Sequence, residues 1–79
     1  MAHYQLTATI WREGEQYVSK CPELGVASSG DTAEEAMEAL REAVELYLEN
    51  ARELGLLDDL EPTLTAPRRF SAPLEVTVP

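Results

Sequence analysis

An α+β fold with the order β-β-β-α-β is the architecture that this chain of 79 residues favours. Two observations carry the prediction. Apolar and polar residues alternate in short stretches on both sides of a central segment, which is typical of strands. The central segment, 33–53, contains no glycine or proline and repeats its apolar residues with a helical period. We therefore expect an antiparallel sheet with one long helix packed on one face, and treat 1–79 as one domain.

Three stretches before the helix read as consecutive strands. Residues 3–12 alternate, and Glu13-Gly14-Glu15 is a polar break of the kind that a hairpin turn uses. The strand pattern resumes in QYVSKC and ends at Pro22, which has no N–H to donate to a ladder. Leu24 to Ser29 is predicted to form a third, short strand of small residues. Short connections between consecutive strands predict an antiparallel meander.

The helix has clear start and stop signals. Thr32 and Glu35 form the T-x-x-E capping box, so we expect the helix to begin at Ala33. Nothing interrupts it before about Glu53, and Gly55 follows as a C-terminal stop.

The segment after Gly55 differs in character because four prolines punctuate it. We expect most of it to run extended. LEVTV, Leu74 to Val78, alternates again and is predicted to be the final strand.

At about 100° per residue, the helix divides into two faces. One face, here called the acidic stripe, gathers seven glutamates: Glu34, Glu35, Glu38, Glu42, Glu45, Glu49 and Glu53. The opposite face is apolar, and Met37, Leu46 and Leu48 widen it to about 200°, more than one sheet needs. We therefore expect Met37 and Leu48 to contact another subunit.

Like charges four residues apart destabilise a helix by about 0.2–0.5 kcal/mol per pair, and the stripe contains several such pairs. A basic partner would relieve this repulsion. The alternative is that glutamates simply form a solvated helix face. The partner hypothesis names Glu38, Glu42, Glu45 and Glu49 as contacts.

The composition narrows the classes of partner. A net charge of −9 argues against direct binding to nucleic acid or to an anionic membrane. A chain of this size buries only a small core, so we expect it to bury further surface by self-association as a dimer or tetramer. No segment resembles a signal peptide or a membrane span, and the lone cysteine fits a reduced, cytoplasmic setting.

The residues that usually carry chemistry do not form a catalytic or metal-binding set. One cysteine and one histidine cannot supply a structural zinc site. Cys21 lies at a strand end without a cation on its own face, so we expect a small buried or half-buried residue. The carboxylates gather on the helix instead of converging on the sheet. We predict no enzyme activity and no cofactor.

Other side chains are candidates for protein contacts. Trp11 falls on the sheet face opposite Ile10, where an exposed tryptophan is typical of an interface. Arg68 and Arg69 form the one adjacent basic pair, either as solvated loop residues or against the acidic stripe of a neighbouring subunit. Val76 in the final strand completes the expected oligomer contacts.

Three ordered motifs give the chain a specific resemblance over residues 4 to about 55. YVSKCPEL, SSGDTAEEA and EAVELYLE, at Tyr17–Leu24, Ser28–Ala36 and Glu42–Glu49, resemble the HicB-like antitoxin domain. The resemblance implies a truncated ribonuclease-H-like fold without nuclease activity. It also implies that the chain neutralises a small basic mRNA-cleaving toxin of the HicA type.

Antitoxins of this kind often add a DNA-binding helical domain, and residues 56–79 leave no room for two helices. Direct DNA binding is therefore doubtful. The alternative function is a stand-alone oligomeric scaffold or regulatory protein with no toxin partner.

Overall fold

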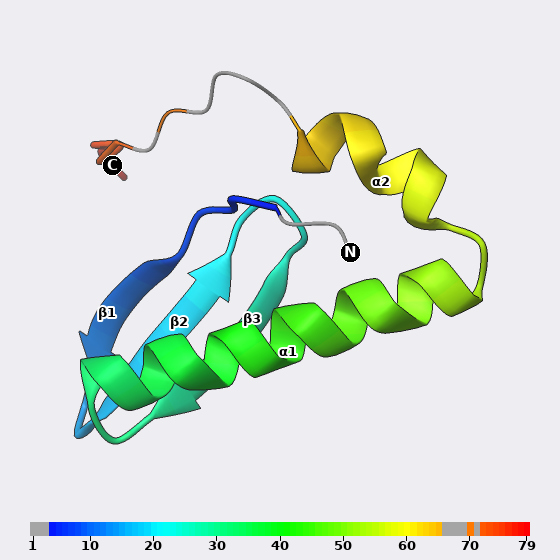
Figure 1. Cartoon of the computed structure of the whole chain (residues 1–79). Coiled ribbons are helices and arrows are strands. Elements are labelled where there is room, and N and C mark those ends of the chain that lie inside the picture. The colour runs from blue at the N-terminus through cyan, green and yellow to red at the C-terminus, as the bar shows by residue number, and fades with distance from the viewer. Residues whose placement is uncertain (1–3, 66–69, 71) are drawn as a thin grey trace.

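The computed structural model describes residues 4–65, 70 and 72–79. Three strands, β1 (Thr9–Glu13), β2 (Gln16–Cys21) and β3 (Val26–Gly30), form an antiparallel sheet in the order β1-β2-β3. A long helix, α1 (Ala33–Glu53), and a short one, α2 (Leu57–Leu64), follow (Figure 1). The α+β class, the meander and the long helix are confirmed.

The strand boundaries follow from local hydrogen bonds. A two-residue loop with Gly14 at φ 64° joins β1 to β2, as a tight hairpin requires. β1 is shorter than the predicted 3–12, because the N–H of Thr7 bonds to the Glu23 carboxylate instead of a strand. β3 starts later than predicted, because the N–H groups of Leu24 and Gly25 turn back to the Cys21 carbonyl.

Both ends of α1 match their sequence signals. The Thr32 hydroxyl accepts a hydrogen bond from the Glu35 N–H at 3.0 Å, as an N-cap does. The Glu35 carboxylate reaches back one residue further than in the usual capping box and accepts from the Asp31 N–H. Gly55, at φ 74°, follows the C-cap residue Leu54, and its N–H donates to the Arg52 carbonyl.

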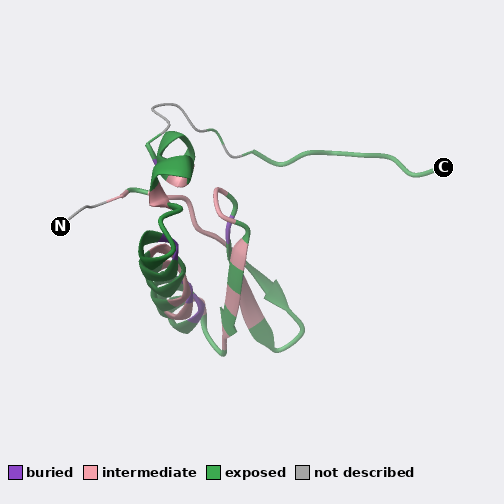
Figure 2. Ribbon diagram, turned by 90° about the vertical axis from the view of Figure 1, so that its right-hand side faces the viewer, coloured by how far each residue is buried: buried purple, intermediate pink, exposed green. Residues whose placement is uncertain are grey.

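α1 covers one face of the sheet and leaves the other face open (Figure 2). It lies mainly over β3 and β2 and has the least contact with β1. Apart from Leu40, the buried side chains between the two layers are small, and Ser19 on β2 donates a hydrogen bond at 2.8 Å to the Ala36 carbonyl on α1. The fully buried group in the described residues comprises Ser19, Cys21, Ala36, Leu40, Ala51 and Leu64.

The segment after α1 departs from the prediction in two ways. Residues 57–64 are helical rather than extended, because Leu57, Leu60 and Leu64 have helical spacing and Leu64 is buried. Leu74 to Val78 does not form the predicted fourth strand. In the described chain this segment pairs with no strand, and Leu74 is 85% exposed.

Candidate partner-binding surfaces

The acidic stripe is an exposed, continuous surface of α1. All seven of its glutamates are exposed in the structure. The helix packs on the sheet through Ala36 and Leu40, which lie on the opposite side of the helix from Glu42 and Glu49. The stripe therefore faces directly away from the sheet and is free to meet a partner.

Little within the described chain neutralises the stripe. Glu38 forms an ion pair with Arg41 at 3.1 Å, and both side chains are more than half exposed. The Glu35 carboxylate is engaged at the helix start by the Asp31 N–H. No hydrogen bond or ion pair joins the side chains of Glu42, Glu45 or Glu49 to another described residue, so carboxylates remain available along about two helical turns.

Trp11 lies on the other side of the molecule. It pairs with Val18 across the hairpin, on the sheet face that α1 does not cover, and is 42% exposed. The predicted placement of Trp11 is confirmed. The acidic stripe lies on the outer side of α1, and Trp11 lies on the sheet face that α1 does not cover. One small flat partner therefore does not contact both Trp11 and Glu42. The structure thus separates two groups of residues that the sequence placed in one candidate list.

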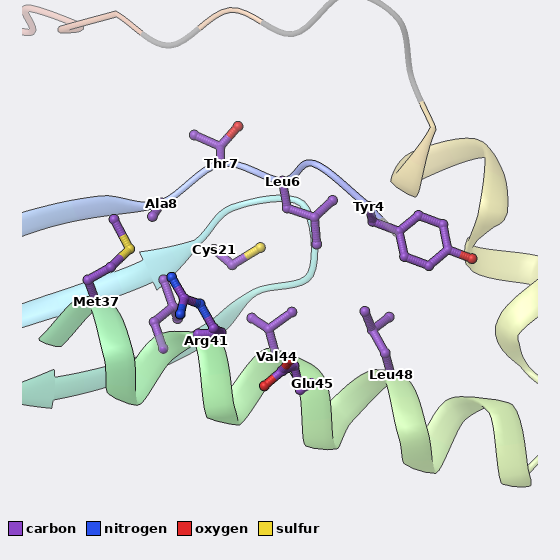
Figure 3. A pocket seen from close by; sticks show the side chains of 11 residues that line it. Tyr4, Leu6, Thr7, Ala8, Cys21, Met37, Arg41, Val44, Glu45 and Leu48 are labelled. Atoms are coloured by element: carbon purple, nitrogen blue, oxygen red, sulfur yellow. The ribbon is translucent and has the colours of Figure 1, made fainter. Parts of the chain in front are cut away.

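A groove runs between α1 and the start of the chain. Its volume is about 360 Å³, and its walls are mostly apolar (Figure 3). Met37, Val44 and Leu48 contribute one wall, and Tyr4, Leu6 and Ala8 contribute much of the other. Met37 and Leu48 thus face the same groove, whose rim carries Arg41 and Glu45.

The remaining predicted oligomer contacts divide between described and undescribed residues. Val76 is 72% exposed in the extended segment 72–79. Arg68 and Arg69 lie outside the residues that the structure describes. Among the described residues, the predicted oligomer contacts therefore lie in two places, the groove, with Met37 and Leu48, and the end of the chain, with Val76.

The cysteine is part of a small structural cluster. Cys21 is 1% exposed, and its thiol donates to the Glu23 carboxylate at 3.4 Å. Burial raises the pKa of the Cys21 thiol, and the adjacent Glu23 raises it further against an opposing backbone hydrogen bond from Leu24. A buried thiol held in its neutral form is a poor nucleophile. The prediction of a buried cysteine is confirmed.

Glu23 is a residue whose role the sequence did not reveal. Its carboxylate accepts hydrogen bonds from the N–H and the hydroxyl of Thr7, the latter at 2.7 Å. Partial burial works to raise the pKa of Glu23, but the bonds from Thr7, from the backbone and from Cys21 outweigh it and lower the pKa to about 2. Glu23 therefore fastens the start of the chain to the turn after β2.

A second apolar surface lies where α1 meets α2. A hollow of about 490 Å³ is lined by side chains of both helices, among them Tyr47 and Leu60, and by Leu54 and Leu56 in the connection between them. Leu54 and Leu56 are 73% and 48% exposed. The leucine spacing of α2 was the available sequence signal for this surface, and the prolines around it obscured that signal.

Within residues 4–65, 70 and 72–79, no group of three histidine, cysteine, aspartate or glutamate side chains is placed to hold a metal ion. None of the helices formed by these residues is long and apolar enough to cross a bilayer. Charge, an exposed tryptophan and apolar hollows are features that the described chain does offer to another molecule.

Comparison with known proteins adds no relative to this description. No family model matches the sequence, and no curated protein or solved structure matches it significantly. The functional argument therefore rests on the motifs of the sequence and on the surfaces described above.

Proposed function

We propose that this chain is a non-catalytic, cytoplasmic interaction protein of the HicB-like antitoxin type, with a truncated ribonuclease-H-like fold. It neutralises a small, basic, mRNA-cleaving toxin of the HicA type. The observation that carries the proposal is the acidic stripe, in which seven exposed glutamates follow one face of α1. An RNA-cleaving protein must present cations to the phosphate backbone, and those cations are complementary to such a stripe.

The acidic stripe is better explained by binding to a cationic partner than by a contribution to the stability of the chain. Repulsion between glutamates four residues apart destabilises α1. A cationic partner would offset this repulsion and would itself be attracted by the carboxylates. Complementary fields also speed the encounter of two proteins, by an amount that salt reduces. In this proposal the stripe covers the cationic surface through which the toxin binds RNA, so that RNA and antitoxin compete for one site.

The binding test uses matched variants. Glu42→Lys/Glu49→Lys reverses two stripe charges and spares Glu38, which already pairs with Arg41. Glu13→Lys/Glu15→Lys, at the exposed hairpin turn, raises the net charge by the same amount at positions outside the stripe. Tagged protein is first used to capture partners from the native lysate at low and at high salt, and each partner is identified by mass.

A small basic protein recovered at low salt and depleted at high salt is then purified and assayed for RNA cleavage. The proposal predicts that wild-type protein and the hairpin variant inhibit cleavage, whereas the stripe variant inhibits at least tenfold less well. Recovery of copies of the chain alone, at either salt, would overturn the toxin assignment. Equal inhibition by both variants would remove the stripe from the mechanism.

A stand-alone oligomeric scaffold or regulatory protein is the second candidate. The groove between α1 and the start of the chain favours it, because one chain that carries both an apolar groove and exposed apolar residues at its end is suited to self-assembly. Operator binding by this chain is not part of either proposal. Residues 56–79 contain α2 as their one described helix, and the net charge of −9 disfavours contact with phosphates.

A further inference from the structure

The sheet face that α1 does not cover has no part in the proposed contact with a toxin. Ser19 and Cys21 of β2 are buried toward α1, so Val18 and Lys20 point to the opposite side of the sheet. Figure 2 shows α1 on one side of the sheet and this side bare. Strand pairing adds residues 9, 11 and 13 of β1 and residues 27 and 29 of β3 to the same side. We call this surface the open face.

The open face is apolar at its centre and balanced in charge. Trp11, which is 42% exposed, pairs with Val18 in the middle of the hairpin. Glu13 lies toward one end of the strands and Lys20 toward the other, so the face carries one charge of each sign in a chain whose net charge is −9. Within the described chain neither Glu13 nor Lys20 forms an ion pair. A fitting partner therefore has an apolar centre and one charge of each sign.

A second copy of the open face meets these requirements. If a two-fold axis runs across the strands at the Trp11–Val18 pair, the strands of the two copies stack antiparallel, as in an aligned sandwich. The two tryptophans then meet at the centre, and Lys20 of each copy lies beside Glu13 of the other. A two-fold axis along the strands would instead bring Lys20 opposite Lys20. Charge therefore selects the first arrangement.

Stacking of the open faces also keeps the two acidic stripes apart. Two packed sheets are about 10 Å apart, and a helix is about 10 Å across. α1 then forms the outer layer on each side, and the stripes lie about 30 Å apart on opposite surfaces. This separation is several times the screening length of about 8 Å at physiological salt. Two strongly acidic chains can thus meet here with little repulsion between their stripes.

Other ways of joining two copies lack this advantage. Antiparallel pairing of two free sheet edges would place both α1 helices on one side of a continuous sheet, with both stripes facing the same way. A symmetric contact across the groove would bring Glu45 of each α1 toward the other helix. The hollow between α1 and α2 includes Asp59 and no lysine or arginine among the described residues that line it.

We propose that two copies of this chain associate through their open faces. Trp11 and Val18 form the centre of the contact, and Lys20 of each copy pairs with Glu13 of the other. Three strands about 4.8 Å apart and about five residues long cover about 14 by 17 Å, which is at the low end for a specific interface. The dimer is therefore weak and reversible, with a dissociation constant of the order of 50 μM. The inference is independent of toxin binding.

The first test measures self-association of the full chain by sedimentation equilibrium, from about 5 μM to about 1 mM. Glu13→Lys and Glu15→Lys raise the net charge equally, but Glu15 lies in the turn outside the open face. Overall charge alone would make both variants associate more tightly. The proposal predicts a dissociation constant at least about fivefold higher for Glu13→Lys, because lysine then faces Lys20 of the other copy. Glu15→Lys should associate at least as tightly as the wild type.

The second test uses complementary charges. Lys20→Glu should weaken self-association as Glu13→Lys does, because two carboxylates then face each other at both ends of the contact. In an equal mixture of the two variants, opposite charges meet again at both ends. The mixed dimer should therefore be at least about tenfold tighter than the dimer of either variant alone. Recovery in the mixture also shows that both variant chains are folded.

The third test locates the contact. Trp11 is the one tryptophan of the sequence, so its fluorescence reports directly on the open face. Dilution of the wild type through the dissociation constant should shift the emission to longer wavelength and increase quenching by acrylamide. The midpoint of this change should agree with the dissociation constant from sedimentation.

A chain that stays monomeric at about 1 mM would overturn the dimer. Association that leaves the Trp11 emission unchanged would place the contact on another surface, and equal effects of Glu13→Lys and Glu15→Lys would remove the ion pairs. A mixture that binds no more tightly than the separate variants would also contradict the arrangement. These tests contain no toxin, so their failure leaves the antitoxin proposal standing. Toxin inhibition assayed below about 1 μM involves the monomer, so its loss leaves the dimer standing.

Discussion

Single residues fix how the two layers of this molecule meet. Gly30 ends β3 immediately before α1, and a Cβ at that position would lie 2.6 Å from the backbone nitrogen of Ala36. Ser19 closes the same junction from β2 with its hydrogen bond to the Ala36 carbonyl. The start of α1 is therefore held against the sheet by one missing side chain and one hydroxyl group.

Gly30→Ala should destabilise the protein by about 1–3 kcal/mol, because the added methyl group meets backbone atoms that cannot turn aside. Ser29→Ala, at the neighbouring exposed position, should change stability by less than about 0.5 kcal/mol. Urea denaturation followed by circular dichroism measures both. Equal midpoints for the two variants would show that the junction relaxes without cost.

Glu23 is the residue whose ionisation contributes to the fold. Its pKa is lowered from 4.5 to about 2 in the folded chain, so its stabilisation is complete above pH 4.5 and is lost as the pH falls toward 2. Glu23→Gln should lower the free energy of unfolding at pH 7 by about 1–2 kcal/mol, less than the full shift implies because the carboxylate is partly exposed.

The measurement is the difference in unfolding free energy between wild type and Glu23→Gln at several pH values. Taking the difference removes the contribution of the other carboxylates, which titrate in both proteins. The difference should shrink steadily below pH 4.5. A difference that stays constant from pH 7 to about 3 would contradict the role assigned to the Glu23 charge.

At the scale of elements, the sequence was most informative where the signals are local. Thr32, Glu35 and Gly55 determine the ends of α1 through hydrogen bonds and backbone geometry within a few residues, so its limits were predicted correctly. α2 could not be predicted with the same certainty, because Pro62 disfavours a helix interior although Leu57, Leu60 and Leu64 have helical spacing.

Strand pairing could not be predicted in the same way. Alternation in residues 74–78 indicates a segment suited to a strand, but a strand also needs a partner, which alternation does not identify. Residues 4–8 are a second example. They continue the alternating pattern of β1, but they are not part of the strand because β2 ends at Cys21 and offers them no partner. For the candidate sites, helical periodicity placed the acidic stripe correctly, whereas the groove depends on how α1 is shifted toward β3.

The acidic stripe should reduce the stability of α1. Glu38 lies four residues before Glu42, and Glu45 lies three residues after it. No lysine or arginine lies three or four residues from Glu42. Glu42→Gln should therefore raise the free energy of unfolding by about 0.4–1 kcal/mol at low salt.

High salt is the control for this prediction, because screening weakens the repulsion between exposed charges. Thermal denaturation at low salt and at about 1 M salt, where the screening length is about 3 Å, should show a gain that largely disappears. An equal gain at both salt concentrations would mean that helix propensity, rather than charge, explains the effect.

At the scale of the whole molecule, the surfaces are arranged so that two kinds of contact can coexist. The acidic stripe points away from the sheet, and the groove opens along the flank of α1 that faces residues 4–8. Arg41 and Glu45 lie at the boundary between these two surfaces. A dimer held through the open face would leave the stripe carboxylates free, so that an assembled protein presents one stripe per copy to a basic partner.

The measurement that tests the central claim most directly is the salt dependence of binding between this protein and the purified basic partner. Isothermal titration calorimetry is run on the wild type, on Glu42→Lys/Glu49→Lys and on Glu13→Lys/Glu15→Lys at several salt concentrations. Wild type and the hairpin variant should lose affinity steeply as salt rises, and the stripe variant should bind weakly with a shallower slope. Equal affinities and equal slopes for all three proteins would contradict the claim that the acidic stripe binds the toxin.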